Sequence, residues 1–338
     1  MRQFIISAGK YLFSLTVAVG LMYYVFHDWD FSDLAERFKQ VNYGWVLLSV
    51  VLSVISHALR AYRWNLLLGP MGYSSLSVYR TFKAVMVGYL TNLAAPRLGE
   101  IARCGILKRT DNVNMSASIG TVVAERIFDF LVLLALILLA FILEFDRISH
   151  FFAGFINDKY AGMNLTTYKL GLLLIFGFIL AASVFTLWWF RERIKKKPFY
   201  YKIRSFLREM TDGFTSVLRL ERKAGFWVST VFIWLLYYVM AYVLFFSVAS
   251  TSHLGLAAGL SILIMGGLGM SAPVQGGFGT YHLLVGSILL TYGIAEKDGY
   301  FFATLVHASQ TVAVMAIGGL SLLLTLPEKK KEIVEPKK

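Results

Sequence analysis

The chain has 338 residues, of which 57% are hydrophobic, 15% aromatic and only 16% charged, and its mean hydropathy is +0.63. Soluble domains average roughly 45–50% apolar and about 25% charged residues, so this composition excludes a water-soluble globule. The net charge of +13 stands in loops beside apolar spans, where it sets topology and meets anionic lipid rather than nucleic acid. A lone cysteine, Cys104, excludes an internal disulfide and a cysteine metal cluster.

Apolar runs recur along the chain, and each is long enough to cross a bilayer of about 30 Å. The sequence therefore predicts an all-α polytopic integral membrane protein. The first run has no small-residue cleavage site and is interpreted as a retained helix rather than a signal peptide. The six predicted spanning helices cover residues 8–26, 43–59, 116–143, 168–190, 226–249 and 300–326.

Two further apolar regions are interrupted by proline and glycine, and they predict broken-helix hairpins. In the first, residues 77–107, the arm from Ala84 to Ala95 is about 18 Å of helix, too short to cross the membrane. In the second, residues 255–294, the first arm is about 27 Å long. The first break is therefore expected within the membrane, whereas the second region is either re-entrant or a pair of spanning helices.

The distribution of Lys and Arg predicts the orientation. Residues 191–223 carry 11 basic and 4 acidic residues and are assigned to the cytoplasm, as are both termini, while residues 27–42 and 144–158 face outward. These assignments agree if each hairpin leaves the membrane on the side that it entered. Residues 191–225 then form a basic cytoplasmic loop with an amphipathic helix on the anionic leaflet, and residues 327–338 form a disordered basic tail.

The order helix, helix, hairpin, helix then occurs twice within a single membrane domain, residues 1–338. The first unit covers residues 8–143, and the second covers residues 168–326 with inverted topology because each unit crosses the membrane three times. Inverted repeats with broken helices at mid-membrane are typical of transporters. The alternative is a helix bundle whose glycines serve only for close packing.

Four polar residues lie in or beside the first break: Asn92, Arg97, Glu100 and Arg103. Charges in the bilayer interior are costly and need partners or water. Glu100 and Arg103 have the spacing of a helical pair, which leaves Arg97 without a local acid. The preceding proline suits a helix start near Arg97, and a helix N-terminus beside an arginine favours a phosphate group. The alternative is a buried ion pair that only fixes the hairpin.

Three charged residues follow in the predicted span 116–143: Glu125, Arg126 and Asp129. The two acids share one face of the helix, and Arg126 is available to either. Intramembrane acids are typical of ion or substrate paths, but these two can equally be countercharges for Arg97 and Arg103. Both roles stay open at the level of sequence.

The second break supplies further candidates for substrate binding: Gln275, Gly276, Gly277, Gly279 and His282. The glycines permit unusual backbone conformations and close approach of a ligand, although tight helix packing explains them equally well. His282 has a side chain that titrates near neutral pH and is a candidate proton carrier. We favour the simpler interpretation of His282 as a satisfied packing residue.

Arg60, Arg63 and Trp64 end the second span and are interpreted first as an interfacial anchor, then as headgroup contacts. Enzyme motifs are missing: the sequence has no phosphate-binding Gly-Lys loop, no paired-aspartate metal motif and no His-Glu-x-x-His. The histidines have no metal-ligand spacing. We therefore expect a translocase rather than an enzyme, and assign no catalytic residue, metal or cofactor.

Four stretches of the chain resemble the lysylphosphatidylglycerol synthase transmembrane region, a flippase-like membrane domain. They are Arg60-Ala-Tyr-Arg-Trp64, Asn92-Leu-Ala-Ala-Pro-Arg-Leu-Gly-Glu-Ile-Ala-Arg103, Glu125-Arg-Ile-Phe-Asp129 and Pro273-Val-Gln-Gly-Gly-Phe-Gly279. The resemblance covers residues 8–326, and its second and third stretches are the most specific. One departure is His282, because the family usually has a glutamate after the glycine turn.

The resemblance implies a lipid translocase of the bacterial plasma membrane that moves phospholipid, or polyprenyl or glycolipid phosphate, between leaflets. It implies a stand-alone member, since the chain ends at Lys338 without room for the aminoacyl-transferase domain. Two alternatives stay open: a membrane-embedded lipid-phosphate transferase, with a metal at Glu125 or Asp129, and a non-transporting partner of an envelope-lipid enzyme. A homo-oligomer is also open.

Overall fold

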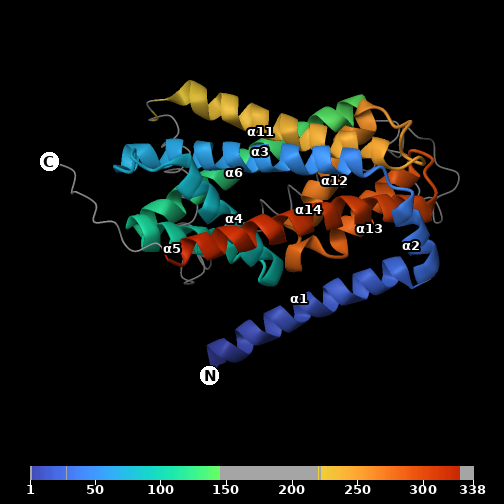
Figure 1. Cartoon of the computed structure of the whole chain (residues 1–338), viewed down its shortest axis with the longest axis horizontal. Coiled ribbons are helices and arrows are strands. Elements are labelled where there is room, and N and C mark those ends of the chain that lie inside the picture. Colours follow the sequence, from blue (N-terminus) through green and yellow to red (C-terminus); the bar gives the residue numbers. More distant parts are fainter. Residues whose placement is uncertain (1, 28, 145–219, 221, 328–338) are drawn as a thin grey trace, which may run out of the picture.

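The computed structural model describes residues 2–27, 29–144, 220 and 222–327, and this part of the chain is built from helices with no strand (Figure 1). The predicted span 168–190 and most of the predicted amphipathic helix lie outside the described residues. The helices are α1 (Arg2–Phe26), α2 (Phe31–Lys39), α3 (Tyr43–Leu68), α4 (Val78–Ala94), α5 (Gly99–Asp111), α6 (Met115–Leu143), α11 (Lys223–Val243), α12 (Leu256–Ser271), α13 (Thr280–Leu290) and α14 (Glu296–Thr325), with short 3₁₀ turns η1 (Gly69–Met71), η2 (Leu244–Ser247) and η3 (Gln275–Gly277).

Four helical segments are long and apolar enough to cross a membrane. They are Tyr43–Met71, Ser118–Leu143, Lys223–Ser247 and Glu296–Thr325, and they correspond to four of the six predicted spans. In α1 the apolar part, Ser14–Phe26, is shorter. Large apolar side chains on these helices are exposed, as expected of surfaces that contact hydrocarbon; examples are Leu47, Ile142, Val231 and Leu323.

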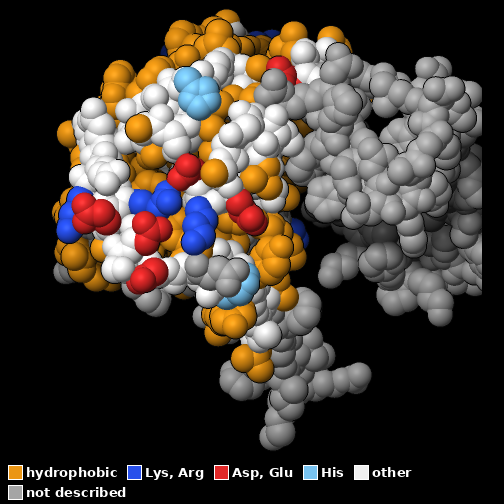
Figure 2. Space-filling model, turned by 90° about the vertical axis from the view of Figure 1, so that its right-hand side faces the viewer, with side chains coloured by type: hydrophobic (Ala, Val, Ile, Leu, Met, Phe, Trp, Pro, Cys, Tyr) orange, Lys and Arg blue, Asp and Glu red, His pale blue; other side chains and the backbone are white. Residues whose placement is uncertain are grey.

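One end of the molecule, the α2 end, collects the turns that the sequence places outside the cell. Arg37 of α2 pairs with Asp298 of α14 at 2.5 Å, and the Asn42 amide donates to the Ser247 carbonyl at 2.9 Å. Figure 2 shows this end of the molecule, where acidic and basic side chains gather at the centre and hydrophobic side chains surround them. The helix α2 itself, which sequence analysis treated as a loop, begins at an N-cap aspartate, Asp30.

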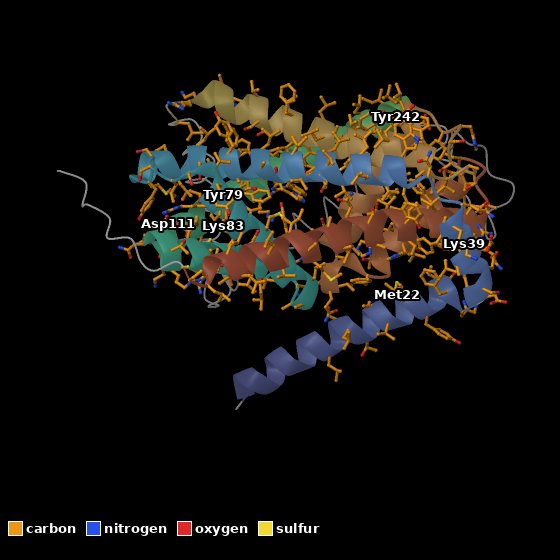
Figure 3. The ribbon with its side chains drawn as sticks, viewed as in Figure 1. Met22, Lys39, Tyr79, Lys83, Asp111 and Tyr242 are labelled. Atoms are coloured by element: carbon orange, nitrogen blue, oxygen red, sulfur yellow. The ribbon has the colours of Figure 1, made fainter. Side chains whose placement is uncertain are left out.

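The opposite end, the α5 end, collects basic residues that the sequence places on the cytoplasmic side. Arg80 pairs with Asp111, which joins the start of α4 to the end of α5. Arg109 donates to the Thr325 carbonyl of α14 at 2.8 Å. Figure 3 shows Lys83 and Asp111 toward this end and Lys39 at the other end. The segments that charge assigns to opposite faces of the membrane therefore lie at opposite ends of the molecule.

The two interrupted regions both form helical hairpins, and they open toward opposite ends. Helices α4 and α5 open at the α5 end, and α12 and α13 open at the α2 end (Figure 1). The arms touch closely: a methyl group on Gly99 would lie 2.1 Å from the Gly88 carbonyl oxygen. At a rise of about 1.5 Å per residue, α12 is about 24 Å and α13 about 16 Å long, so neither crosses a bilayer of about 30 Å.

The two hairpins contact each other beside their bends. The end of α4 packs against η3, the turn between α12 and α13. A methyl group on Gly276 would lie 2.9 Å from the end of the Leu93 side chain, so the two segments approach closely here, and the φ of +52° at this position favours glycine. Segments that enter from opposite ends of the molecule are thereby brought into contact, the end of helix α4 against the turn η3.

Helix α1 docks on the second bend. The Ser14 hydroxyl contacts the Pro273 carbonyl oxygen at 3.0 Å and the Gln275 side-chain oxygen at 2.9 Å. Nearby, Gly279 has φ +81°, and a methyl group there would lie 2.4 Å from the Leu21 β-carbon of α1. The second bend therefore depends on glycine both for its backbone conformation and for the position of α1.

The docking of α1 gives a testable prediction for Gly279→Ala. A non-glycine residue in the left-handed region costs about 1–3 kcal/mol, and the clash with Leu21 adds to that cost. The matched control is Gly293→Ala, where φ is +79° and no atom lies within 4 Å of the added methyl. We expect Gly279→Ala to lower the thermal midpoint in detergent clearly more than Gly293→Ala. Equal midpoints would show that α1 does not depend on this contact.

Candidate functional site

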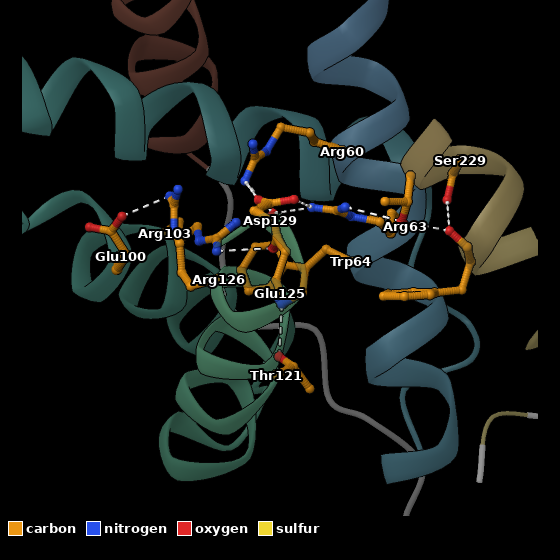
Figure 4. Close-up of polar contacts among 12 residues, drawn as sticks. Arg60, Arg63, Trp64, Glu100, Arg103, Thr121, Glu125, Arg126, Asp129 and Ser229 are labelled. Atoms are coloured by element: carbon orange, nitrogen blue, oxygen red, sulfur yellow. Dashed lines mark hydrogen bonds and ion pairs between the residues drawn. The ribbon is translucent and has the colours of Figure 1, made fainter. Parts of the chain in front are cut away.

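Three arginines and two carboxylates form a buried arginine–carboxylate network inside the helix bundle (Figure 4). Its members are Arg60 and Arg63 of α3, Arg103 of α5, and Glu125 and Asp129 of α6. The network joins the second arm of the first hairpin to two long helices. Because the members come from three helices, the network fixes the position of the hairpin against the bundle.

Glu125 is the centre of the network. Its Oε1 accepts from Arg60 Nη2 at 2.6 Å and from Arg63 Nη2 at 3.2 Å, and its Oε2 accepts from Arg103 Nη2 at 3.1 Å. Asp129 accepts from the same two α3 arginines at 2.9 and 2.8 Å. Arg60 also donates to the Tyr237 hydroxyl of α11 at 3.0 Å. Both carboxylates are therefore fully engaged by the protein itself.

The network lies deep in the protein. The side chains of Arg63 and Glu125 have no exposed surface, and Arg103 is only 5% exposed. Glu125 follows the start of α6 by ten residues, about 15 Å along the axis from the α5 end. An isolated charge at such depth is costly, so the carboxylates and arginines stabilise one another.

The interpretation of Arg60, Arg63 and Trp64 as an interfacial anchor is wrong. Arg60 and Arg63 are 5% and 0% exposed, and Trp64 is completely buried. The Trp64 Nε1 donates to the Thr121 hydroxyl at 2.8 Å, and the Arg103 guanidinium lies 4.5 Å from the Trp64 ring centroid. Positions 60, 63 and 64 share one face of α3, and that face packs toward α5 and α6 rather than toward lipid.

The predicted pairing of Glu100 with Arg103 is also wrong. Glu100 instead accepts from Arg126 Nη2 of α6 at 2.8 Å, with side-chain exposures of 27% and 44%. Helix α5 packs against α6, so cross-helix partners replace the local pair. Of the two arginines that Glu125 and Asp129 were expected to balance, Arg103 contacts Glu125, and Arg97 contacts neither acid.

Arg97 lies at the first bend, exposed, with φ +64°. Within the described part of the chain, its guanidinium has no hydrogen-bond or ion-pair partner. A non-glycine residue in this region costs about 1–3 kcal/mol, and such strain is concentrated at functional sites. Helix α5 begins at Gly99, close to Arg97 as the sequence predicts, and the Asn92 side-chain oxygen accepts from the Gly99 amide at 2.7 Å. The next amides of the first turn have no intrahelical acceptor, which suits an anion.

The second bend uses its glycines for conformation. Gly276, Gly277 and Gly279 all have positive φ, between +52° and +81°. All three are buried, as is the Gln275 side chain that contacts Ser14. These candidates therefore shape the bend and its contact with the first hairpin, rather than exposing side chains to a ligand.

His282 is a buried residue that stabilises the bend. It is 2% exposed, and its Nδ1 accepts from the Gly279 amide at 3.3 Å, which caps α13. Its ring centroid lies 4.9 Å from that of His307, whose Nε2 contacts the Gly276 carbonyl at 2.8 Å. The packing interpretation of His282 agrees with this geometry. Sequence analysis missed His307 and Tyr237, although each is a polar side chain within a predicted apolar span.

The described residues contain no group of three or more His, Cys, Asp or Glu side chains that could hold a metal ion. Four membrane-length helices, two hairpins from opposite ends and a buried charge network define a polytopic helical membrane protein. The chain matches the family described as the lysylphosphatidylglycerol synthase TM region over residues 11–318, and it belongs to that family. Comparisons with curated proteins and with solved structures give no match.

Proposed function

We propose that the protein is a flippase-like lipid transporter, which moves a phospholipid or lipid-phosphate headgroup between membrane leaflets without a covalent reaction. Membership of the family supports a lipid-related membrane function. The observation that carries the proposal is the contact of the end of α4 with the second bend, together with the unpaired guanidinium of Arg97 at the first bend, which follows α4. A headgroup at this place is within the membrane-spanning part of the protein, where transfer between leaflets requires a polar path.

Each candidate residue has a role in this proposal. Arg97 and the first amides of α5 bind the headgroup phosphate, since guanidinium groups form strong charge-assisted hydrogen bonds with phosphate. Asn92 fixes the start of α5 by accepting from Gly99. The arginine–carboxylate network holds α5 in register with α3 and α6. The acyl chains stay in the surrounding lipid.

An inverted repeat over residues 8–143 and 168–326 accounts for the opposite entry of the hairpins. In transporters of this kind, one repeat rocks against the other around a fixed central site. The contacts of α1 with the second bend and of Leu93 with Gly276 are the places where such a movement changes packing. Both termini lie in the cytoplasm in this proposal, and the membrane is the bacterial plasma membrane.

The transferase alternative is less well supported. It needs a free acid or a metal at Glu125 or Asp129, but all four carboxylate oxygens of these residues accept from arginines. A non-transporting partner of an envelope-lipid enzyme would move no lipid between leaflets when purified alone, whereas we expect the purified protein to do so. Transport by the isolated protein distinguishes the two.

The test is a leaflet-exchange assay with the purified full-length chain in phosphatidylcholine vesicles that contain trace acyl-labelled fluorescent phosphatidylglycerol. A membrane-impermeant reductant removes the fluorescence of the outer leaflet only. We expect the protein to make the inner-leaflet fluorescence accessible as well, while protein-free vesicles retain it. Retention of that fluorescence by vesicles that contain well-folded protein, across several labelled lipid phosphates, would overturn the proposal.

A further inference from the structure

Two buried histidines hold the two ends of the second bend. His307 of α14 is 5% exposed, and its Nε2 donates to the Gly276 carbonyl at 2.8 Å. His282 of α13 is 2% exposed, and its Nδ1 accepts from the Gly279 amide at 3.3 Å. Because a carbonyl only accepts and an amide only donates, His307 carries a hydrogen on Nε2 and His282 carries none on Nδ1. Two neutral rings satisfy both hydrogen bonds.

The same two glycines are the places where the bend meets its neighbours. A methyl group on Gly276 would lie 2.9 Å from the Leu93 side chain of α4, and one on Gly279 would lie 2.4 Å from the Leu21 β-carbon of α1. The histidine pair therefore holds the backbone on which α4 and α1 dock.

Aromatic rings enclose the pair. Phe278 and Tyr281 lie beside His307, with ring centroids 4.8 and 5.2 Å from that of the imidazole. Tyr281 and Phe26 of α1 lie beside His282, at 6.2 and 6.3 Å. These neighbours provide apolar and aromatic surface but no countercharge for a protonated imidazole.

The elements packed around the pair also have little negative charge. Helices α1, α3, α4, α12 and α13 contain no aspartate or glutamate. Helix α14 has Glu296 and Asp298 at its start, and Asp298 lies about 14 Å along the axis from His307. Asp298 and Asp33 of α2 both pair with Arg37. Titratable side chains that flank the contacting parts of these helices are Tyr24, Tyr43, His57, Tyr89 and Tyr300.

A proton on either histidine disturbs this arrangement. An imidazolium carries a hydrogen on both nitrogens, so protonated His282 turns a donor toward the Gly279 amide and loses that hydrogen bond. Protonated His307 keeps its bond to Gly276 but places an uncompensated charge in a buried position, 4.9 Å from the His282 ring. The docked bend therefore disfavours proton binding, whereas imidazoles open to water accept protons.

Building on the proposed transport function, we propose that His282 and His307 form a proton-binding site, and that proton uptake is coupled to release of the second bend from α1 and α4. These contacts are the ones that the transport proposal requires to change. Since the released bend binds more protons than the docked bend, docking loses stability as the pH falls through about 6.5, where an exposed imidazole titrates. Proton uptake thereby supplies a driving force for the movement.

The test measures the release of α1 by thiol labelling of the full-length chain in which Cys104→Ser removes the native thiol. Ala18→Cys places a thiol at a position of α1 that is 5% exposed, and Val19→Cys places a control thiol at the next position, which is 61% exposed. The ratio of their rates with a membrane-permeant maleimide cancels the pH dependence of the thiol itself. We expect this ratio to rise about tenfold for one proton, or up to about a hundredfold for two, between about pH 7.5 and about pH 5.5.

Two substitutions remove the titration and keep the hydrogen bonds. His307→Gln presents an amide donor to the Gly276 carbonyl, and His282→Asn presents an amide oxygen to the Gly279 amide. We expect the ratio to be independent of pH in the double variant. The matched control, His253→Gln at an exposed turn, keeps the wild-type dependence. A dependence that survives in the double variant belongs to another group and overturns the proposal, and so does a wild-type ratio that is constant with pH.

Leaflet exchange of labelled phosphatidylglycerol at the same two pH values separates this inference from the proposed function. Exchange by a protein whose labelling ratio does not change with pH overturns the proton site and leaves transport standing. A pH-dependent ratio that the double variant abolishes, without exchange of any labelled lipid, supports the proton site and overturns the transport function.

Discussion

Replacing Arg97 by glycine is expected to slow lipid exchange by about one to two orders of magnitude while leaving the protein folded. Glycine adopts φ +64° without steric cost, so Arg97→Gly removes the guanidinium and relieves the strain of the bend together. A hydrogen bond to a charged group contributes about 1.5–3 kcal/mol, so its loss slows exchange by roughly tenfold to a hundredfold. The measurement is leaflet exchange of labelled phosphatidylglycerol in vesicles.

Two further variants make this result specific. Lys108→Ala removes one positive charge from an exposed position on the same hairpin, toward the α5 end, and we expect exchange at the wild-type rate. Arg97→Lys keeps the charge but not the fork of donors, and we expect partial activity.

Protection of the single cysteine, Cys104, from maleimide reports that the hairpin is still docked, since this thiol is completely buried. Full exchange by Arg97→Gly with Cys104 protected would remove Arg97 from the site.

The sequence predicts the hairpins well because their cause is local. Proline, glycine and short arm length break a helix wherever they occur, and both breaks lie at the predicted places. The placement of segments at the two ends is predictable for a similar reason, because the loop charges that determine it are visible one segment at a time. Helix α2 is missed because its nine residues are too short and polar to give a spanning signal.

The pairing of charges is not predictable in this way. Arg60 and Arg63 have the sequence pattern of an interfacial anchor, and only the packing of α3 against α6 turns them inward to Glu125. Glu100 and Arg103 have the spacing of a helical pair, but each has a better partner on α6. Periodicity identifies the face of a helix on which a charge lies; which helix meets that face is a tertiary property.

The second large effect is expected for Glu125→Gln. This substitution leaves three buried arginines with one carboxylate, that of Asp129, which contacts only two of them. Removing one partner of a buried ion pair costs about 3–5 kcal/mol, because the remaining charges lose their compensation. The hairpin is linked to the network through Arg103, so we expect α5 to separate from α6 in this variant. Cys104, the next residue along α5, then reacts with maleimide at least about tenfold faster than in the wild type.

Glu100→Gln is the matched control for this prediction. Glu100 is also a glutamate with an arginine partner on an adjacent helix, but its pair with Arg126 is partly exposed. Exposed pairs contribute about 0–1 kcal/mol, so this variant is expected to keep Cys104 protected and the thermal midpoint nearly unchanged. Equal labelling of Cys104 in both variants would mean that the network does not hold the hairpin. The difference between the two variants therefore measures burial and the number of arginine partners rather than the loss of a carboxylate as such.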